Sequence, residues 1–443
     1  MSLYQAAYFA LALVVLAFLV QRGRVQPFLA LLVTAIGFGY AAGMSTSGVG
    51  KAFGLGFAQS VNALGLTVVA AALMAEIADA TGATAWLQHG ASGRRRRSLP
   101  LALVGLIGGL ASTPAASFAV LNPLRRGFGG DSPRSALVLG LSLSASHGLL
   151  IPAPVMLASL TILAADWTLS VAFGLPLALL LALVGLGLAH ATTSGAARPV
   201  DTATAISGAS LHAPRRGAWA LGAASAVLVA LLITQSLGDI ASEPLGGGSN
   251  REFLIALGRP TLLLLVGTGL LLLLSWHWEP GGLTEEGWAG RAIRRAAGLV
   301  LLIGAAGGLT KIAQDTGMPE MNAERLLGFV PPGALALILP FALAAIVKTL
   351  QGSSLVAAIT AAGMMMELVG PLGLDDPAGR TLAALAIGAG AMTVSHINDG
   401  LFWLVGQAAR LPAGTTLVRF SLATAVQGVL ALAGLIVLRL FFH

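Results

Sequence analysis

The chain has 443 residues, of which 56% are hydrophobic and only 10% are charged. Soluble domains are about a quarter charged, so this composition argues against a water-soluble fold. The formal net charge of +7 does not indicate a nucleic-acid partner, because the arginines cluster in short loops that flank apolar runs, as in loops retained in the cytoplasm. The chain has no cysteine, which excludes disulfides and thiol chemistry.

Apolar runs of about twenty residues, each long enough to cross a hydrocarbon core about 30 Å thick, recur along the chain. The first run lacks a basic start and a small-residue cleavage site, so we expect it to remain as a span. If the basic loop at 22–24 is cytoplasmic, the N-terminus lies outside. The first half then contains spans at 3–20, 27–43, 57–79, 135–163 and 168–189.

Residues 99–121 are also apolar, but a polar break at 112–114, around Thr113, interrupts them. Basic loops lie on both sides of this segment, at 94–97 and 125–126. A segment that enters and leaves the membrane on the cytoplasmic side satisfies both observations. We therefore predict a re-entrant hairpin with its tip near Thr113.

The second half continues in register after a polar, cytoplasmic linker at 191–216. We predict a second hairpin at 330–369, broken at 351–354, although its legs are long enough to be full spans. Further spans are predicted at 217–237, 260–278, 297–314, 380–410 and 415–440. The expected fold is an all-α integral membrane protein with a single membrane domain, about ten full spans and two re-entrant hairpins, and both termini outside.

The two halves of the sequence resemble each other. The segment 76–82 (EIADATG) is echoed at 311–317 (KIAQDTG), and each is followed by a hairpin and then by a span with a Ser-His pair. Because the two hairpins enter from opposite sides, we interpret 57–189 and 260–443 as an inverted repeat connected by 190–259. Transporters with such repeats bind substrate near the midplane, at broken helices.

Polar groups inside apolar spans are costly and usually functional. The densest group is Ser395, His396, Asn398 and Asp399, which follows the apolar run 382–392. We interpret it as an unwound helix whose backbone and side chains can bind an anion or a cation. The alternative is a wet helix end at the membrane interface.

A second group is the pair Ser146 and His147, followed by Pro152 and Pro154, which remove backbone donors and break a helix. Carbonyls freed in this way are tolerated at membrane depth only where they are buried in protein or line a cavity. A histidine with an unperturbed pKa of about 6.5 could carry a proton in a symport cycle. The alternative is a histidine that is only hydrogen-bonded in the core.

The hairpin tips form the third group. Gln351, Gly352, Ser353 and Ser354 offer backbone N–H groups and hydroxyls at a helix N-terminus, which suit a carboxylate. Thr113 could do the same at the other tip, and a plain turn is the alternative at both. No metal-ligand spacing, nucleotide loop or Ser-His-Asp arrangement rises above chance, so we expect no metal, no cofactor and no catalytic residues.

These groups resemble segments of the gluconate permease family, the gluconate:H+ symporters of the ion transporter superfamily. The segments are SHINDGLFWLV at 395–405, IVKTLQGSSLVAAITAAGMM at 346–365 and SASHGLLIPAPVMLA at 144–158, and their order and spacing fit over essentially the whole chain. The resemblance implies proton-coupled uptake of gluconate or a related small hydroxy-carboxylate across the bacterial inner membrane. In that membrane the outer side, where the basic loops predict both termini to lie, is the periplasmic side.

The sequence also departs from the family. The stretch 113–118 lacks the acidic residue that the first hairpin usually carries, and Gly400 replaces a usual serine. By elimination, the titratable candidates for proton coupling inside the membrane are His147, His396 and Asp399.

Other functions remain open at this point. A sodium-coupled carboxylate carrier is the main alternative, because unwound carbonyls together with Asn398 and Asp399 also suit Na+. An intramembrane enzyme is a remote alternative, since Ser395 and His396 adjoin on one helix and cannot face each other as nucleophile and base. A homodimer in the lipid bilayer is compatible with either carrier.

Overall fold

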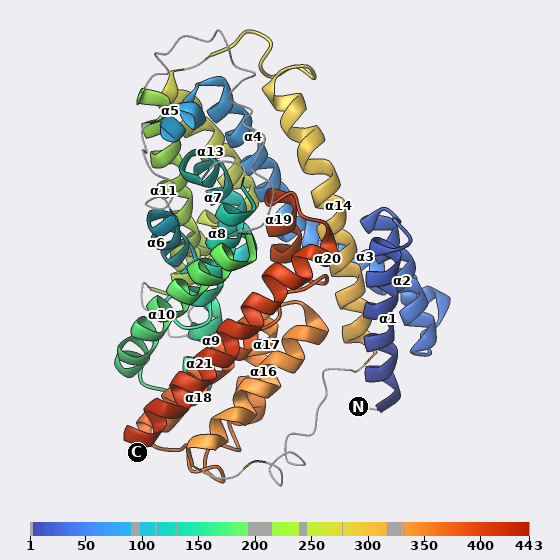
Figure 1. Ribbon diagram of the computed structural model, residues 1–443, viewed down its shortest axis with the longest axis vertical. Helices are drawn as coiled ribbons and strands as arrows, with labels where there is room; N and C mark the ends of the chain where they lie inside the picture. Colours follow the sequence, from blue (N-terminus) through green and yellow to red (C-terminus); the bar gives the residue numbers. More distant parts are fainter. Residues whose placement is uncertain are drawn as a thin grey trace.

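A computed structural model describes residues 3–89, 98–110, 113–129, 132–193, 215–238, 246–276, 278–316, 330 and 333–442. Every regular element among these residues is a helix (Figure 1). Helices satisfy their own backbone polar groups, which a lipid environment requires. Six described helices are long and apolar enough to cross a membrane: Thr46–Ala80, Trp167–Thr193, Arg215–Gln235, Trp288–Asp315, Ala334–Gln351 and Ala413–Phe441. The predicted all-helical membrane fold is confirmed, and the count of ten spans stays a prediction.

The third helix starts earlier than predicted. α1 (Leu3–Gln21) and α2 (Pro27–Ala41) lie where spans were expected, but the next helix begins at Thr46 rather than at residue 57. It runs for 35 residues through α3 (Thr46–Ser60), a π-helical turn (Val61–Gly65) and α4 (Leu66–Ala80). Glycine disfavours an isolated helix, but here it permits close packing on α14 (Trp288–Asp315). A Cβ on Gly56 would lie 2.3 Å from the Gly307 carbonyl oxygen.

The first predicted hairpin and the span after it are interrupted where expected. α6 (Ser98–Gly108) and α7 (Pro114–Gly129) are separate helices, and the span predicted at 135–163 is divided into α8 (Pro133–His147) and α9 (Pro154–Ile162). Proline suits the first position of a helix, where its missing N–H costs nothing, and both α8 and α9 begin with one. The neighbouring helices are α5 (Ala83–His89) and α10 (Trp167–Thr193).

The second half is likewise built from long and broken helices. The loop predicted between α11 (Arg215–Gly238) and α13 (Pro260–Ser275) contains a short surface helix, α12 (Ser249–Leu257), that has no buried residue. A 3-10 turn (Ala334–Leu337) leads into the second hairpin. The hairpin and the helices after it are α16 (Ile338–Gln351), α17 (Ser354–Met365), α18 (Pro377–Met392), α19 (Gly400–Ala408), α20 (Ala413–Thr416), a π-helical turn (Leu417–Ser421) and α21 (Leu422–Phe441).

Two hydrophobic cores hold these helices together. One is built mainly from α1 to α4, α7, α8, α11, α13, α14 and α19, and the other mainly from α9, α10, α16, α17, α18 and α21. In the second half the chain passes between the cores repeatedly, and two of these passages run from Val347 to Leu350 and from Ala391 to Ile397. Both passages lie at helix breaks, so these two breaks are placed where the cores meet.

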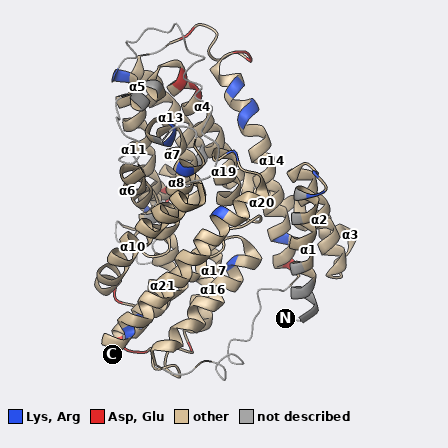
Figure 2. Cartoon of the chain, in the orientation of Figure 1, with Lys and Arg blue, Asp and Glu red and all other residues tan. Residues whose placement is uncertain are grey.

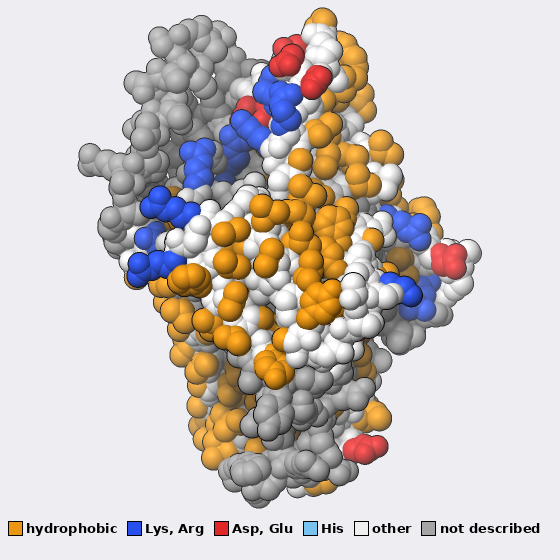
Figure 3. Space-filling model, turned by 90° about the vertical axis from the view of Figure 1, so that its right-hand side faces the viewer, with side chains coloured by type: hydrophobic (Ala, Val, Ile, Leu, Met, Phe, Trp, Pro, Cys, Tyr) orange, Lys and Arg blue, Asp and Glu red, His pale blue; other side chains and the backbone are white. Residues whose placement is uncertain are grey.

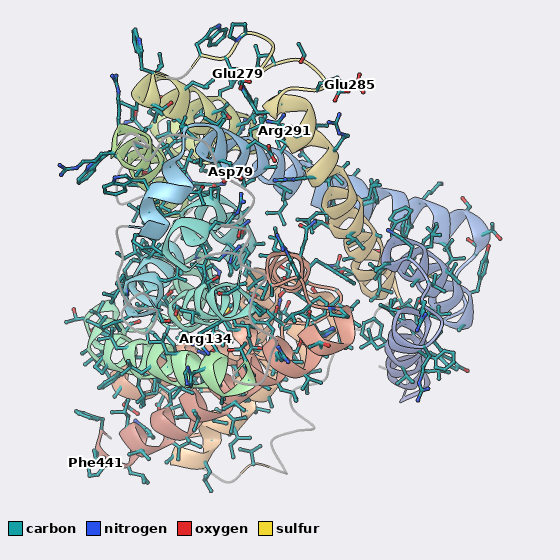
Figure 4. All side chains as sticks on the ribbon, turned by 45° about the horizontal axis from the view of Figure 1, so that its top comes forward. Asp79, Arg134, Glu279, Glu285, Arg291 and Phe441 are labelled. Atoms are coloured by element: carbon teal, nitrogen blue, oxygen red, sulfur yellow. The ribbon has the colours of Figure 1, made fainter. Side chains whose placement is uncertain are left out.

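Charged side chains gather at one end of the molecule. Figure 2 shows them around α4, α5 and the start of α14, and Figure 4 places Asp79 and Arg291 at this end, away from Phe441. Glu76 is buried there and pairs with Arg291 at 2.9 Å and with Arg295. Figure 3 shows hydrophobic side chains spread over a broad face beneath a band of basic ones. This distribution fits a protein whose sides face lipid and whose charged end faces water.

Candidate functional site

The segment 393–399 is unwound, as its polar sequence predicted. It separates α18 from α19, and Val394 has φ +52°, a left-handed conformation that a β-branched residue rarely adopts. Contacts with the last membrane helix hold this backbone in place. The Ser395 amide donates to Thr424 Oγ1 at 3.1 Å, and its carbonyl accepts from Ser421 Oγ at 2.5 Å. The strained turn is therefore stabilised by a neighbouring helix, as is common at functional sites.

The tip of the second hairpin lies directly against this unwound segment. α16 ends at Gln351, Gly352 has φ +69°, and Ser353 caps α17 by accepting from the Val356 amide at 3.3 Å. A Cβ on Gly352 would lie only 2.3 Å from the Asn398 carbonyl oxygen. The two helix breaks are thus in van der Waals contact, and only glycine permits that distance.

Two side chains of the unwound segment tie it to the last turn of α16. Asn398 Nδ2 donates to the Thr349 carbonyl at 2.9 Å, and His396 lies 3.0 Å through Nε2 from the same oxygen. Because a carbonyl can only accept, the ring nitrogen of His396 must carry the proton of this bond. Both side chains are buried.

An ion pair that the sequence analysis did not predict links the same two breaks. Lys348 Nζ lies 2.8 Å from Asp399 Oδ2 and donates to the Gly352 carbonyl at 2.6 Å. Asp399 also accepts from the hydroxyl of Ser395 and from the Leu401 amide, which caps α19. The signal available in the sequence was a single lysine within the otherwise uncharged stretch 334–350.

Two buried acceptors at this junction have no hydrogen-bond partner among the described residues. They are Asn398 Oδ1 and Gln351 Oε1, whose residues are 5% and 3% exposed. Buried polar atoms in native proteins are normally paired, so each such atom needs a water, an ion or a ligand to satisfy it. The adjoining Gly352, Ser353 and Asp399 are only partly buried, which leaves the junction accessible.

The tip of the first hairpin approaches from the other side. Thr113 is exposed and its Oγ1 accepts from the Ala116 amide at 3.2 Å at the start of α7. Ala115 lies 3.8 Å from the position that a Cβ on Gly400 would occupy. The start of α7 therefore lies beside the start of α19, which Asp399 caps, and the free N–H groups and positive dipole ends of these two helices favour an anion.

Ser146 and His147 contact the first hairpin rather than the second. The Ser146 hydroxyl donates within α8, to the Ser142 and Leu143 carbonyls, and His147 donates through Nδ1 to the Gly109 carbonyl at 2.9 Å. The two halves of the protein are in contact at the residue after His147. A Cβ on Gly148 would lie 2.6 Å from the Gly388 carbonyl oxygen.

A cavity of about 390 Å³ lies near the unwound segment 393–399. It opens between the α1–α2 loop, α14 and the α19–α20 region. Its walls include Arg24, Phe402, Trp403 and Leu411. Trp403 Nε1 donates to the Ile397 carbonyl at 2.7 Å, so one wall is anchored to the unwound segment. Within the described part of the chain, no three His, Asp or Glu side chains gather closely enough to hold a metal ion.

Comparison with known proteins identifies one family. The model of the GntP family permeases matches residues 4–441. The chain is 26% identical to the gluconate permease of Pseudomonas aeruginosa over 431 residues, which cover 94% of this chain and 93% of that protein. It is 26% identical to the low-affinity gluconate transporter of Escherichia coli K12 over 443 residues, 97% of each chain. It is 24% identical to the Gnt-II system L-idonate transporter of the same strain over 429 residues, 95% of each.

These relatives are permeases and transporters, and the match includes both hairpins and both helix breaks described above. The intramembrane-enzyme alternative is therefore wrong. With its apolar helices and this match along nearly its whole length, the chain belongs to the GntP family of membrane permeases.

Proposed function

We propose that this chain is a secondary active transporter that takes up gluconate, or a related small hydroxy-carboxylate, together with protons across a bacterial inner membrane. Its family and the gluconate and L-idonate transporters among its relatives support the substrate class. The observation that carries the proposal is the pair of unpartnered buried acceptors, Asn398 Oδ1 and Gln351 Oε1, beside the N-termini of α17 and α19. A polyhydroxy acid supplies a carboxylate for the N–H groups and hydroxyl donors for the amide oxygens.

The roles of individual residues follow from their positions. The substrate carboxylate docks on Gly352, Ser353 and Ser354 at the start of α17, where free N–H groups and the helix dipole attract an anion. Substrate hydroxyls donate to Asn398 and Gln351. Among the remaining candidates, Thr113 belongs to the site because its hairpin contacts Gly400. Ser395 acts through its hydrogen bond to Asp399. Ser146 shapes the end of α8 through its bond to the Ser142 carbonyl.

Proton coupling is assigned to a histidine. Asp399 already accepts hydrogen bonds from Lys348, Ser395 and the Leu401 amide, which favours its charged form throughout the cycle. His147 and His396 each donate one ring proton to a carbonyl, and an imidazole in this arrangement gains its charge by binding a second proton. These two residues are therefore the better candidates among the three.

Purified protein in liposomes tests this function directly. An imposed inward proton gradient is expected to drive accumulation of labelled gluconate, and a protonophore is expected to abolish it. An inward sodium gradient without a pH difference is expected to drive none. Accumulation that follows the sodium gradient alone would establish the sodium-coupled alternative instead.

We further propose the inverted-repeat architecture of ten spans and two re-entrant hairpins, with both termini periplasmic. Several segments predicted to be cytoplasmic are held together at one end of the molecule, which supports this orientation. Asp79 pairs with Arg126 at 2.9 Å, and Arg216 Nε donates to the Leu274 carbonyl at 2.8 Å. The cavity beside Trp403 adjoins two more such loops, so we assign it as the cytoplasmic exit. A homodimer stays a prediction.

A further inference from the structure

Lys348 lies in an apolar helix, and its side chain is only 2% exposed. Its ammonium joins the two helix breaks of the second half, because Nζ contacts the Gly352 carbonyl at 2.6 Å and the Asp399 carboxylate at 2.8 Å. The carbonyl follows the C-terminal end of α16, and the carboxylate caps the N-terminus of α19. One positive charge is thus held by oxygen atoms from both breaks.

This set of oxygen atoms is the kind that binds a metal cation. Discontinuous helices of secondary transporters coordinate sodium with unwound carbonyls and with the C-terminal ends of half-helices. Hard cations prefer carboxylate and carbonyl oxygens, and the negative end of the α16 dipole adds to the attraction. Here the side chain of the protein itself, rather than a dissolved ion, supplies the charge.

The ion pair also matters for an anionic substrate. Asp399 lies next to Asn398 and is partly accessible. Without a cation beside it, the carboxylate would repel a substrate carboxylate placed on the adjoining N-terminus of α17. With Lys348 in place the pair is neutral, and the helix N-termini attract the anion.

We propose that the Lys348 ammonium is a built-in cation of the substrate site, which takes the place of a transported sodium ion, neutralises Asp399 and holds the two breaks together. Substrate binding then requires no sodium. This inference rests on the proposed function, because it concerns the site assigned to the carboxylate. Lys348 is a positioning residue, since it acts through Asp399 and the Gly352 carbonyl.

The test compares purified full-length wild type with Lys348→Ala in sodium chloride and in choline chloride. Gluconate affinity is measured by calorimetry and the melting temperature by thermal shift. For the wild type, both quantities are expected to be the same in the two salts, within about twofold for affinity. For the variant in choline, affinity should fall at least about tenfold and the melting temperature at least about 5 °C, because the partly buried Asp399 carboxylate loses its counter-ion.

Chemical rescue distinguishes a built-in cation from a merely structural lysine. Sodium, or ethylammonium added to fill the vacated space, is expected to raise the melting temperature of Lys348→Ala and to recover its gluconate binding. Lys311→Ala is the matched control, because that lysine pairs with Asp315 on α14, away from the breaks, and should show no cation effect. The thermal-shift measurement uses no substrate, so it still tests Lys348 if gluconate proves to be the wrong acid.

Two results would overturn the proposal. One is a wild type whose gluconate affinity or melting temperature depends on sodium. The other is a folded Lys348→Ala whose melting temperature responds to neither cation. If Lys348→Ala cannot be purified, Lys348→Ala/Asp399→Asn replaces it. This variant lacks both charges, so it should be recovered in better yield and its melting temperature should not respond to either cation. A cation response in it would also contradict the proposal. The wild-type comparison requires no variant at all.

Discussion

His147 donates a hydrogen bond through Nδ1 to the carbonyl oxygen of Gly109 at 2.9 Å, just past the end of α6. In the other half, His396 lies 3.0 Å through Nε2 from the Thr349 carbonyl, in the last turn of α16. Each histidine comes directly after a serine in the sequence. Each contacts a carbonyl at the end of the first helix of the hairpin that comes before it in the chain. The same contact in both halves supports the proposed inverted repeat, and it couples each hairpin to a helix break.

His147→Gln should separate this structural contact from proton transfer. A glutamine amide can still donate to the Gly109 carbonyl, but it cannot bind a proton near neutral pH. We expect the variant to fold and to bind gluconate, while its uptake rate loses the pH dependence that the wild type shows, because an amide cannot take up the second proton that an imidazole can. Initial uptake rates in proteoliposomes measure this, with His396→Gln as the matched variant. If both variants keep the wild-type pH profile, neither histidine carries the proton.

Gly352→Ala should disrupt the contact between the two breaks. Gly352 has φ +69°, and an added Cβ would lie 2.3 Å from the Asn398 carbonyl oxygen. Strain and displacement together should cost about 2–4 kcal/mol and abolish uptake. Gly363→Ala is the control, because that glycine lies within α17 with open space around it, and alanine there should be neutral or slightly stabilising. Equal melting temperatures for the two variants would refute this account of Gly352.

The positions of the helix breaks could be predicted from the sequence because their causes are local. Pro154, Gly352 and the polar run after Thr393 each interrupt a helix through their own backbone or side-chain chemistry. The start of α3 could not be predicted in the same way. Glycine has a poor intrinsic helix propensity, and the close packing on α14 that overrides it is a tertiary effect.

The connections between the breaks were harder to predict. Lys348 and Asp399 are separated by 51 positions in sequence, and only the packing of α16 against α18 brings them together. Asp399 was among the candidate site residues predicted from the sequence but Lys348 was not, because a pairing across 51 positions cannot be inferred from local chemistry. His147 and His396 each contact the hairpin of their own half, which is likewise a consequence of packing.

The ion pair of Asp376 and Arg439 should make stability depend on pH at the opposite end of the molecule. Burial alone would raise the pKa of Asp376, but hydrogen bonds from Arg439 and the Gly379 amide outweigh it and hold this pKa below its usual value. Because the pKa is lower in the folded state, the stabilisation is present above the unfolded pKa of about 3.9 and is lost as the pH falls through the folded value.

Asp376→Asn tests this linkage, since asparagine can still cap α18 but carries no charge. The variant should melt below the wild type at pH 7, and the difference should shrink as the pH falls below about 4. Asp375→Asn, at an exposed neighbouring position, is the control and should melt like the wild type at every pH. A difference that is independent of pH would show that the charge is not responsible.

The orientation in the membrane can be tested because the protein has no cysteine of its own. Ser249 is exposed at the start of α12, on the predicted outer side, whereas Ser92 lies in the predicted cytoplasmic loop, outside the described residues. With an impermeant maleimide added to intact cells, Ser249→Cys should be labelled and Ser92→Cys should not. Both should react after the membrane is opened. The reverse pattern in intact cells would place both termini in the cytoplasm.

Ser353 and Asn398 should determine the affinity for the acid substrate. Removing either group leaves a buried partner unpaired, at a cost of about 1–3 kcal/mol, so gluconate affinity should fall roughly five- to a hundredfold in Ser353→Ala and in Asn398→Ala. Both residues also have structural contacts, with the Val356 amide and the Thr349 carbonyl. Folding is therefore checked first by melting temperature.

Ser159→Ala provides the matched control for these two variants. Ser159 is a fully buried serine whose hydroxyl donates within α9, to the Val155 carbonyl, away from both helix breaks. Its loss should lower stability slightly and leave gluconate affinity unchanged, because no substrate group is assigned to it. Calorimetric titration of the three folded variants decides between the possibilities. Wild-type affinity in Ser353→Ala and Asn398→Ala would move the substrate site away from the junction of the two breaks, and the motif would then serve only to hold α16 and α19 in place.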